Sequence, residues 1–190
     1  MTEDDPLRRT FAWLAAAATL SFATVGLANQ SDPRLPGLFD RLKAAASPEE
    51  AADAEGRIWA IWHVSGDETI DRMMAEGVNA MTFRDLDRAL AVFDAMVGKA
   101  PNFAEAWNKR ATVRYLRGEY RGSIADIERT LALEPRHFGA LSGLGLVHLA
   151  QGNEAEALGA FDRALAVHPH LAGAETHIRA LREKLKGRGI

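Results

Sequence analysis

The fold is decided by residues 104–137, AEAWNKRATVRYLRGEYRGSIADIERTLALEPRH, and by residues 138–171, FGALSGLGLVHLAQGNEAEALGAFDRALAVHPHL. The two segments follow each other directly, and each is 34 residues long. Gly118 and Gly152 occupy the same position in the two copies. Agreement at fixed positions over a period of this length indicates a structural repeat.

The same period continues upstream. Pro101, Pro135 and Pro169 follow one another at intervals of 34 residues. Eight residues before each proline stands a large apolar residue: Phe93, Ile127 and Phe161. Twelve residues before each proline stands a small one: Ala89, Ser123 and Ala157. The sequence therefore predicts a further, less regular copy over residues 70–103, which lacks the turn glycine.

The unit behind the period is predicted to be a pair of helices. In the first copy, apolar or small residues recur at the spacing of one helix face: Ile70, Met73, Met74, Gly77, Val78 and Met81. After a short break at Thr82–Asp85 the pattern resumes: Leu86, Ala89, Leu90, Phe93, Met96 and Val97. Pro101 ends the second helix, because proline lacks the N–H that a helix interior requires. No strand pattern is present in this region.

Composition supports an all-α chain and excludes several classes of function. Of the 190 residues 47% are hydrophobic, which suffices for a packed core, and unbranched Ala and Leu favour helices. The formal net charge is −3, with acidic and basic residues interspersed, so nucleic-acid binding is disfavoured. The absence of cysteine excludes disulfides, zinc–thiolate sites and thiol catalysis.

These repeats resemble the tetratricopeptide repeat family over Ile70–Leu171. Residues at family positions in the second copy are Trp107, Ala111, Gly118, Ser123, Ile127 and Pro135. Those in the third are Leu141, Leu144, Gly145, Gly152, Ala157, Phe161, Ala164 and Pro169. The resemblance implies an α-solenoid of stacked helical hairpins, with about three repeats over residues 70–103, 104–137 and 138–171. Such hairpins must stack and be capped, because one alone cannot bury its apolar face.

Both caps are predicted from amphipathic segments. Residues 172–190 form a C-terminal capping helix with one apolar stripe: Ala174, Ile178, Leu181 and Leu185. Residues 29–69 hold a linker and an N-terminal helical hairpin at the front of the stack. Its longer helix begins at Ser47-Pro48-Glu49-Glu50, a helix-start pattern, and its shorter helix lies around Gly37–Ala45.

Residues 1–28 are predicted to be a signal peptide or an N-terminal anchor. Arg8-Arg9 precede the uncharged stretch Thr10–Ala28, and small residues stand before a suitable cleavage point. We expect export to the periplasm, with anchoring in the inner membrane through residues 10–28 as the alternative. Arg8-Arg9-Thr10-Phe11 resembles a twin-arginine signal, and the route and the cleavage stay open. The whole chain resembles small exported tetratricopeptide proteins of Gram-negative bacteria.

The family resemblance also implies a binding groove lined by the first helix of each hairpin. Carried onto this sequence, its candidate partner-binding residues are Met74, Val78, Met81, Asn108, Thr112, Tyr115, Ser142, Leu146 and Leu149. An open apolar groove indicates an interaction site. The alternative is that the chain covers the groove itself, through the extended segment Pro33–Phe39 (PRLPGLF). The carboxylate clamp of some family members is broken, because Gly139 and Gly143 stand where its basic residues would be.

A second candidate site is a basic patch formed by Lys109, Arg110, Arg114 and Arg117. Arg110 and Arg114 lie four residues apart on one helix face, at positions that are normally apolar in the family. Buried arginines need acidic partners. One interpretation is internal pairing with Asp126, Glu128 or a carboxylate of the N-terminal hairpin; the other is a patch that binds a partner's carboxylate or phosphate.

No catalytic, cofactor or metal site is predicted. The six histidines are scattered, and neither a Ser/His/Asp set nor a phosphate-binding loop stands out. We therefore expect a non-catalytic protein- or peptide-binding module, acting as a periplasmic scaffold, adaptor or assembly factor. The alternative is an accessory subunit of an envelope enzyme or transporter that docks through the basic patch. Membrane contact is expected only through an uncleaved N-terminal segment. The partner and the oligomeric state stay open.

Overall fold

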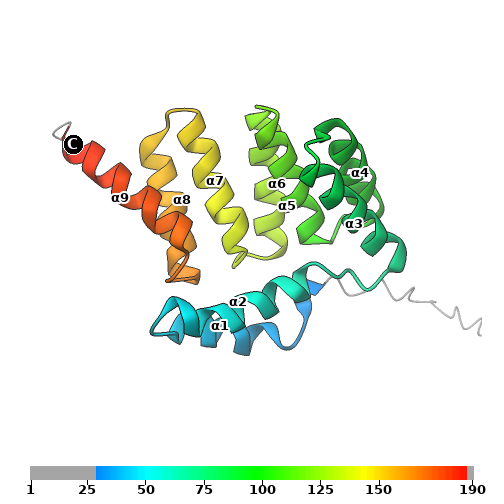
Figure 1. The fold of residues 1–190 in the computed structure, drawn as a ribbon, viewed down its shortest axis with the longest axis horizontal. Helices are drawn as coiled ribbons and strands as arrows, with labels where there is room; N and C mark the ends of the chain where they lie inside the picture. Colours follow the sequence, from blue (N-terminus) through cyan, green and yellow to red (C-terminus); the bar gives the residue numbers. More distant parts are fainter. Residues whose placement is uncertain (1–28, 188–190) are drawn as a thin grey trace, which may run out of the picture.

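The computed structural model describes residues 29–187, and every regular element in that range is helical (Figure 1). A short 3₁₀ turn, η1, precedes the α-helices. The elements are η1 Asn29–Ser31, α1 Leu35–Ala44, α2 Pro48–Trp62, α3 Glu68–Thr82, α4 Leu86–Lys99, α5 Ala104–Leu116, α6 Tyr120–Leu133, α7 Phe138–Ala150, α8 Glu154–Val167 and α9 Ala172–Lys186. The all-α prediction is confirmed. The predictions for residues 1–28 lie outside the described residues.

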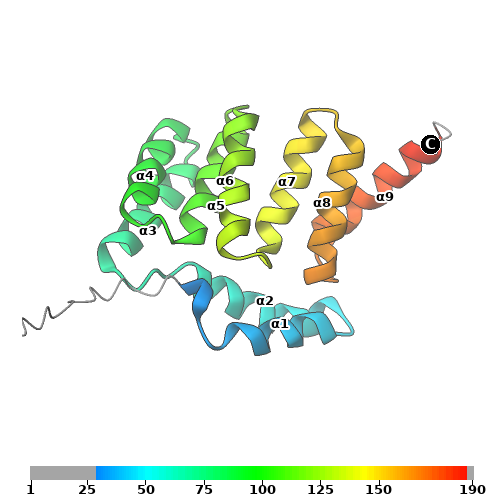
Figure 2. The same ribbon diagram turned by 180° about the vertical axis from the view of Figure 1, so that it is seen from behind.

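Three helical hairpins, α3–α4, α5–α6 and α7–α8, stand side by side and form a solenoid (Figures 1 and 2). Helices α5 and α7 begin at Ala104 and Phe138, the first residues of the two segments that define the period. α9 packs on α8 and buries three residues of its apolar stripe: Ala174, Ile178 and Leu181. No helix within residues 29–187 has the length and apolar character needed to span a bilayer.

One small residue and one large residue join the two helices of each hairpin. Gly77 lies under Phe93, and Gly145 lies under Phe161; a Cβ atom on either glycine would stand 2.5 or 2.6 Å from the phenylalanine ring. Both rings are fully buried. The middle hairpin has buried Ala111 and Ile127 at the corresponding positions. The small residue at this position therefore lets the two helices of a hairpin approach closely.

The turn inside each hairpin requires a left-handed residue. Gly118 and Gly152 have φ angles of 76° and 78°, which a residue without Cβ adopts freely. Arg84 occupies the same place one repeat earlier and has a φ of 60°. The first repeat thus keeps the turn geometry although it lacks the glycine.

Replacing Arg84 by glycine is expected to stabilise the protein. The left-handed conformation costs a residue with Cβ about 1–2 kcal/mol, partly offset by the greater unfolded-state freedom of glycine. We expect Arg84→Gly to raise the free energy of unfolding by about 0.5–1 kcal/mol in urea titrations. The control Arg72→Gly, within α3, should lower it by about 1 kcal/mol. A destabilising Arg84→Gly would contradict this account.

The N-terminal hairpin is placed differently from the prediction. α1 and α2 do not stack in front of the first repeat; they run along the edge of the solenoid where α5 and α7 begin (Figures 1 and 2). The apolar side chains that the repeats contribute to the hairpin's core are Phe138, Val167 and Leu171. The predicted front cap is therefore wrong. The first helix also begins earlier than expected, at Leu35.

Residues 33–39 do not cover the groove. The predicted extended segment is helical from Leu35 onward, because Leu35, Leu38 and Phe39 all bury against α2. The start of α2 agrees with the sequence: the Ser47 hydroxyl accepts the Glu50 N–H at 3.3 Å. The apolar stripe that suggested self-covering belongs to the hairpin's own core.

Candidate functional site

A groove of about 240 Å³ lies between α5 and α7, with α6 contributing to its floor. Its lining residues are Asn108, Ala111, Thr112, Tyr115, Ser123, Ile127, Gly139, Ser142, Gly143, Leu146 and Leu171. None of these side chains is acidic or basic. Most are small or apolar, and a few hydroxyl groups are interspersed. The groove therefore offers packing surface and short polar contacts to an uncharged occupant.

Helical spacing explains how the sequence builds this surface. Asn108, Thr112 and Tyr115 fall at i, i+4 and i+7 on α5, so they share one face. Ser142 and Leu146 are four residues apart on α7 and line the opposite wall. The predicted groove residues of the second and third repeats, except Leu149, are thus brought together.

The predicted groove residues outside this set are not in the groove. Met74 is 4% exposed and is part of the core between α3 and α4, so its prediction as a surface residue is wrong. Met81 and Leu149 pack as partly buried side chains against hydrophobic clusters of the first and third repeats. Val78 is 37% exposed on α3. The groove is confined to the second and third repeats.

Besides Gly139 and Gly143, which the sequence placed at clamp positions, four lining residues were missed as groove residues. Ser123 and Ile127 of α6 and Ala111 of α5 were assigned only to the repeat pattern; each packs inside the hairpin, yet each also forms part of the groove. Leu171 comes from the turn before α9. Its position in the repeat carries no groove signal, because the family pattern places groove residues on the first helix of each hairpin.

The lower end of the groove, formed by Asn108 and Gly139, borders a buried carboxylate. Glu105 is 1% exposed and accepts a hydrogen bond from the Asn108 amide at 2.9 Å. The His137 Nε2 lies 2.9 Å from the same oxygen, Oε2, and the Lys109 ammonium lies 3.0 Å from the other oxygen, Oε1. His63 of α2 approaches it at 3.5 Å. Asn108 is therefore held in place by its neighbours and is not a free clamp residue.

The His137 ring can be assigned a tautomer from its contacts. Its Nδ1 accepts the backbone N–H of Ala140 at 3.1 Å and so caps the N-terminus of α7. A nitrogen that accepts carries no proton, so the proton of the neutral ring is on Nε2, which donates to Glu105. The same side chain thus caps one helix and binds the buried carboxylate of another.

Glu105 remains ionised despite its burial. Burial alone raises the pKa of its carboxyl group, but chiefly the hydrogen bond from His137 and the charge of Lys109 bring it down to about 2. The charged form is thus the one present at neutral pH. Its stabilising contribution would be lost only as the pH falls from about 4.5 toward 2.

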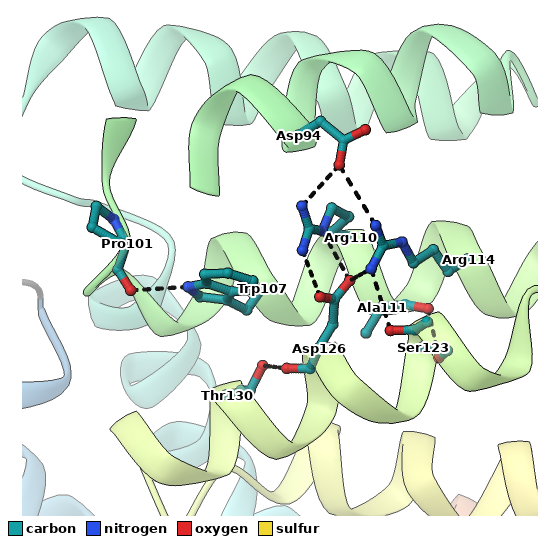
Figure 3. Close-up of polar contacts among 10 residues, drawn as sticks. Asp94, Pro101, Trp107, Arg110, Ala111, Arg114, Ser123, Asp126 and Thr130 are labelled. Carbon is teal, nitrogen blue, oxygen red and sulfur yellow. Dashed lines mark hydrogen bonds and ion pairs between the residues drawn. The ribbon is translucent and has the colours of Figure 1, made fainter. Parts of the chain in front are cut away.

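Arg110 and Arg114 of the predicted basic patch are paired within the chain (Figure 3). Arg110 donates to both oxygens of Asp126, from Nη2 at 2.7 Å and from Nε at 2.9 Å, and to Asp94 at 2.8 Å. Arg114 donates to Asp126 at 2.9 Å. Asp126 is 1% exposed. Of the two interpretations of these arginines, the structure shows internal pairing, with Asp126 as the partner.

The other two basic residues are also paired. Arg117 forms ion pairs with Asp87 and Glu119, and Lys109 pairs with Glu105. A partner's carboxylate or phosphate would have to displace these contacts. Docking through the basic patch stays a prediction that the contacts disfavour.

The histidines do not form a metal site in the described part of the chain. Within residues 29–187, His, Asp and Glu side chains do not gather into any group of three that could ligate a metal ion. His177 stacks on Phe161, with ring centroids 5.0 Å apart. His168 is 1% exposed, beside the edge of Phe138. Packing accounts for the positions of these rings.

Comparison of the sequence with known proteins identifies the same family by a family model and by individual relatives. A tetratricopeptide repeat family model matches residues 74–120 and 109–172. A TPR repeat-containing protein of Rhizobium etli is 38% identical over 154 residues, covering 81% of this chain and 76% of that protein. Tetratricopeptide repeat protein 36 of Bos taurus is 38% identical over 93 residues, covering 47% of this chain and 50% of that protein.

Solved structures share the fold at low sequence identity. The TPR domain of Sgt2 from Aspergillus fumigatus superposes with a TM-score of 0.61 at 18% identity, over 65% of this chain and 83% of that one. The first TPR domain of Spaghetti, bound to an HSP90 peptide, gives 0.60 at 19% identity, over 65% and 98%. The chain belongs to the tetratricopeptide repeat family.

Proposed function

We propose that this chain is a non-catalytic binding module whose groove between α5 and α7 takes an extended segment of a partner protein or peptide. The observation that carries the proposal is the uncharged groove built from two successive repeats. Family membership supports it, because solved relatives include a domain with an HSP90 peptide bound and a yeast Sti1 domain in complex with an Hsp70 peptide. Small-molecule sites usually span about 300–1,000 Å³, so 240 Å³ better suits the anchoring side chains of a peptide.

The lining indicates what kind of segment would bind. Gly143 leaves the α7 wall without a side chain between Ser142 and Leu146, which lets an extended backbone approach closely there. The space at Gly139 is instead taken by the Trp59 indole. Leu146 and Leu171 favour an apolar anchor, while Thr112 and Ser142 offer hydroxyl groups for backbone contacts. Because no lysine or arginine lines the groove, the segment is expected to be apolar and uncharged rather than an acidic C-terminal peptide.

The proposed setting is the periplasm, where the module would act as a scaffold, adaptor or assembly factor. Support comes from Arg8-Arg9 followed by the uncharged stretch Thr10–Ala28. Cell fractionation together with N-terminal sequencing of the mature protein tests this. A cytosolic protein with residues 1–28 intact would contradict export, and a full-length chain in the membrane fraction would favour the anchor.

A charge placed in the groove should abolish binding. We expect Leu146→Glu to weaken partner binding at least tenfold, because the carboxylate must either be desolvated or exclude the ligand. The measurement is site-specific photo-crosslinking in the native cell envelope from a probe at Thr112, which is exposed and lines the groove. The control Ala132→Glu, exposed on α6 outside the groove, should keep the crosslink. If both variants crosslink like the wild type, the groove is not the binding site.

A further inference from the structure

The contact between the α1–α2 hairpin and the repeats, here called the hairpin joint, gathers most of the chain's histidines. His63 approaches Glu105, and His170 Nε2 lies 2.8 Å from the Ala45 carbonyl oxygen. His168 Nε2 lies 3.2 Å from a Glu55 oxygen. At the centre of the joint, Trp62 of α2 stacks on His137 with centroids 4.1 Å apart. The joint is therefore aromatic and polar, unlike the apolar contacts inside the repeats.

The hairpin brings its own core to this joint. The side chains it buries come almost entirely from α1 and α2: Leu35, Leu38, Phe39, Leu42, Ala51, Ala54, Ile58, Ile61 and Trp62. Phe138 is the one fully buried partner from the repeats in this cluster, with Val167 and Leu171 partly buried beside it. The two helices can thus keep most of their apolar packing when they separate from the repeats.

Some buried polar groups of the hairpin joint lack hydrogen-bond partners. The joint therefore contributes less free energy to the docked state. Trp62 Nε1 and His168 Nδ1 are buried without a hydrogen-bond partner among residues 29–187, and His168 Nε2 has only the Glu55 oxygen at 3.2 Å, in a geometry that makes no hydrogen bond. Such groups are rare in a native core, because each loses its bonds to water without replacement. In the described part of the chain, Glu105 is approached across the joint only by His63, at 3.5 Å, because its contacts with Lys109 and His137 lie within the repeats.

The joint also borders the groove. A Cβ atom on Gly139 would stand 2.7 Å from the indole of Trp59, so α2 lies directly against the groove's lower end. A second connection runs from Asn108, in the groove, through its hydrogen bond to Glu105 and on to His63 of α2. Gly139 therefore contacts the hairpin and also lines the groove, and Asn108 in the groove is linked to the hairpin through Glu105.

We propose that the α1–α2 hairpin is a strap that undocks from the repeats as a unit, and that its docked state fixes the shape of the groove's lower end. The pivot is the irregular stretch after α2. Gly66 has a φ of 83°, and Ser65 is already bound to α3 through Asp71 at 2.6–2.7 Å, so bending occurs at His63 and Val64. The part concerning ligands rests on the proposed function of the groove; the undocking does not.

Distance measurements between two spin labels test the undocking. The chain has no cysteine, and a Cβ atom on Gly56 of α2 or Gly159 of α8 would meet nothing within 4 Å, so Gly56→Cys with Gly159→Cys gives a well-tolerated pair. We expect double electron–electron resonance to show a main docked distance and a minor broad component. Trp59→Ala should raise the ratio of the broad to the docked component at least tenfold. A control pair, Gly98→Cys with Gly159→Cys, should keep its distance because both positions belong to the repeats.

A second variant distinguishes undocking of the hairpin from misfolding of the protein. His63→Ala removes a contact to Glu105 without changing the hairpin's apolar core, and it should shift the same ratio in the same direction. Unchanged distributions in both variants would overturn the proposal. Broadening of the control pair together with the hairpin pair would overturn it too, because the hairpin would then unfold only with the whole molecule.

The effect of hairpin undocking on the groove can be measured without a ligand. In amide NMR spectra, Trp59→Ala should shift the signals of Asn108 and Gly139 while leaving the upper groove residues Tyr115 and Leu146 in place. Unmoved signals at Asn108 and Gly139 would refute the link between strap and groove. If no peptide ever binds the groove, only the proposed function fails, and the distance and NMR results stand on their own.

Discussion

Phe161→Ala is expected to lower the free energy of unfolding by about 3–5 kcal/mol, the usual range for removing a buried phenylalanine. The Phe161 ring is fully buried in the cluster that joins α7, α8 and α9. It rests directly over Gly145, so truncation leaves a cavity that the rigid helix backbone cannot fill. Urea unfolding followed by circular dichroism measures the change, and a loss below about 1 kcal/mol would contradict this packing.

The glycine beneath the ring offers a matched test of the same contact. Gly145→Ala should destabilise by about 1–3 kcal/mol through overpacking, partly offset by about 1 kcal/mol of helix propensity. Gly145→Ala combined with Phe161→Ile copies the Ala111–Ile127 pair of the middle repeat. The double variant should lose less free energy of unfolding than the sum of the losses measured for Gly145→Ala and Phe161→Ile alone. Additive losses would show that the two positions do not share one packing site.

Asp126→Ala is expected to destabilise by about 3–5 kcal/mol, because it leaves two partly buried guanidinium groups without their main partner. Both Arg110 and Arg114 donate to this buried carboxylate, as Figure 3 shows. Burial by itself lowers the pKa of Arg110, but the bonds and charge of Asp126 and Asp94 raise it above its ordinary value, so the arginine stays charged. Thermal and urea unfolding measure the loss.

Two further variants separate pairing from mere packing. Asp94→Ala removes a half-exposed partner of the same arginines and should cost less than about 1 kcal/mol. Replacing Arg110, Arg114 and Asp126 together by apolar residues of similar volume should restore most of the stability lost in Asp126→Ala. If Asp126→Ala instead unfolds like the wild type, the arginines are not held internally, and the basic patch becomes a candidate docking surface again.

The repeat register could be predicted because it depends on local chemistry that recurs. Proline stops a helix wherever it stands, and the turn position needs a left-handed residue, so Gly118 and Gly152 mark the hairpins without any tertiary information. The pairing of Arg110 with Asp126 could also have been chosen over Glu128. Arg110 and Asp126 are 16 residues apart, the same separation as Gly145 and Phe161, so the repeat geometry places them opposite each other.

Two of the wrong predictions, Met74 in the groove and the N-terminal hairpin at the front of the stack, have physical reasons that the sequence only partly reveals. Met74 shares a helix face with Ile70 and Gly77, both buried, and this spacing indicated core rather than groove. The hairpin's position depends on contacts of Trp59 and Trp62 with residues more than 70 positions away, and no periodic pattern encodes such a contact. Long-range docking of this kind follows from shape complementarity, which composition and spacing do not specify.

Binding of an extended uncharged peptide in the groove between α5 and α7 can be tested by selecting peptides from a random display library on the purified protein. Amide NMR then maps where the selected peptides bind. We predict enriched sequences with an apolar anchor and no acidic terminus. Their binding should shift the signals of Thr112, Ser142 and Leu146. Selection of no peptide, or of peptides whose shifts fall outside α5 and α7, would contradict the proposed binding.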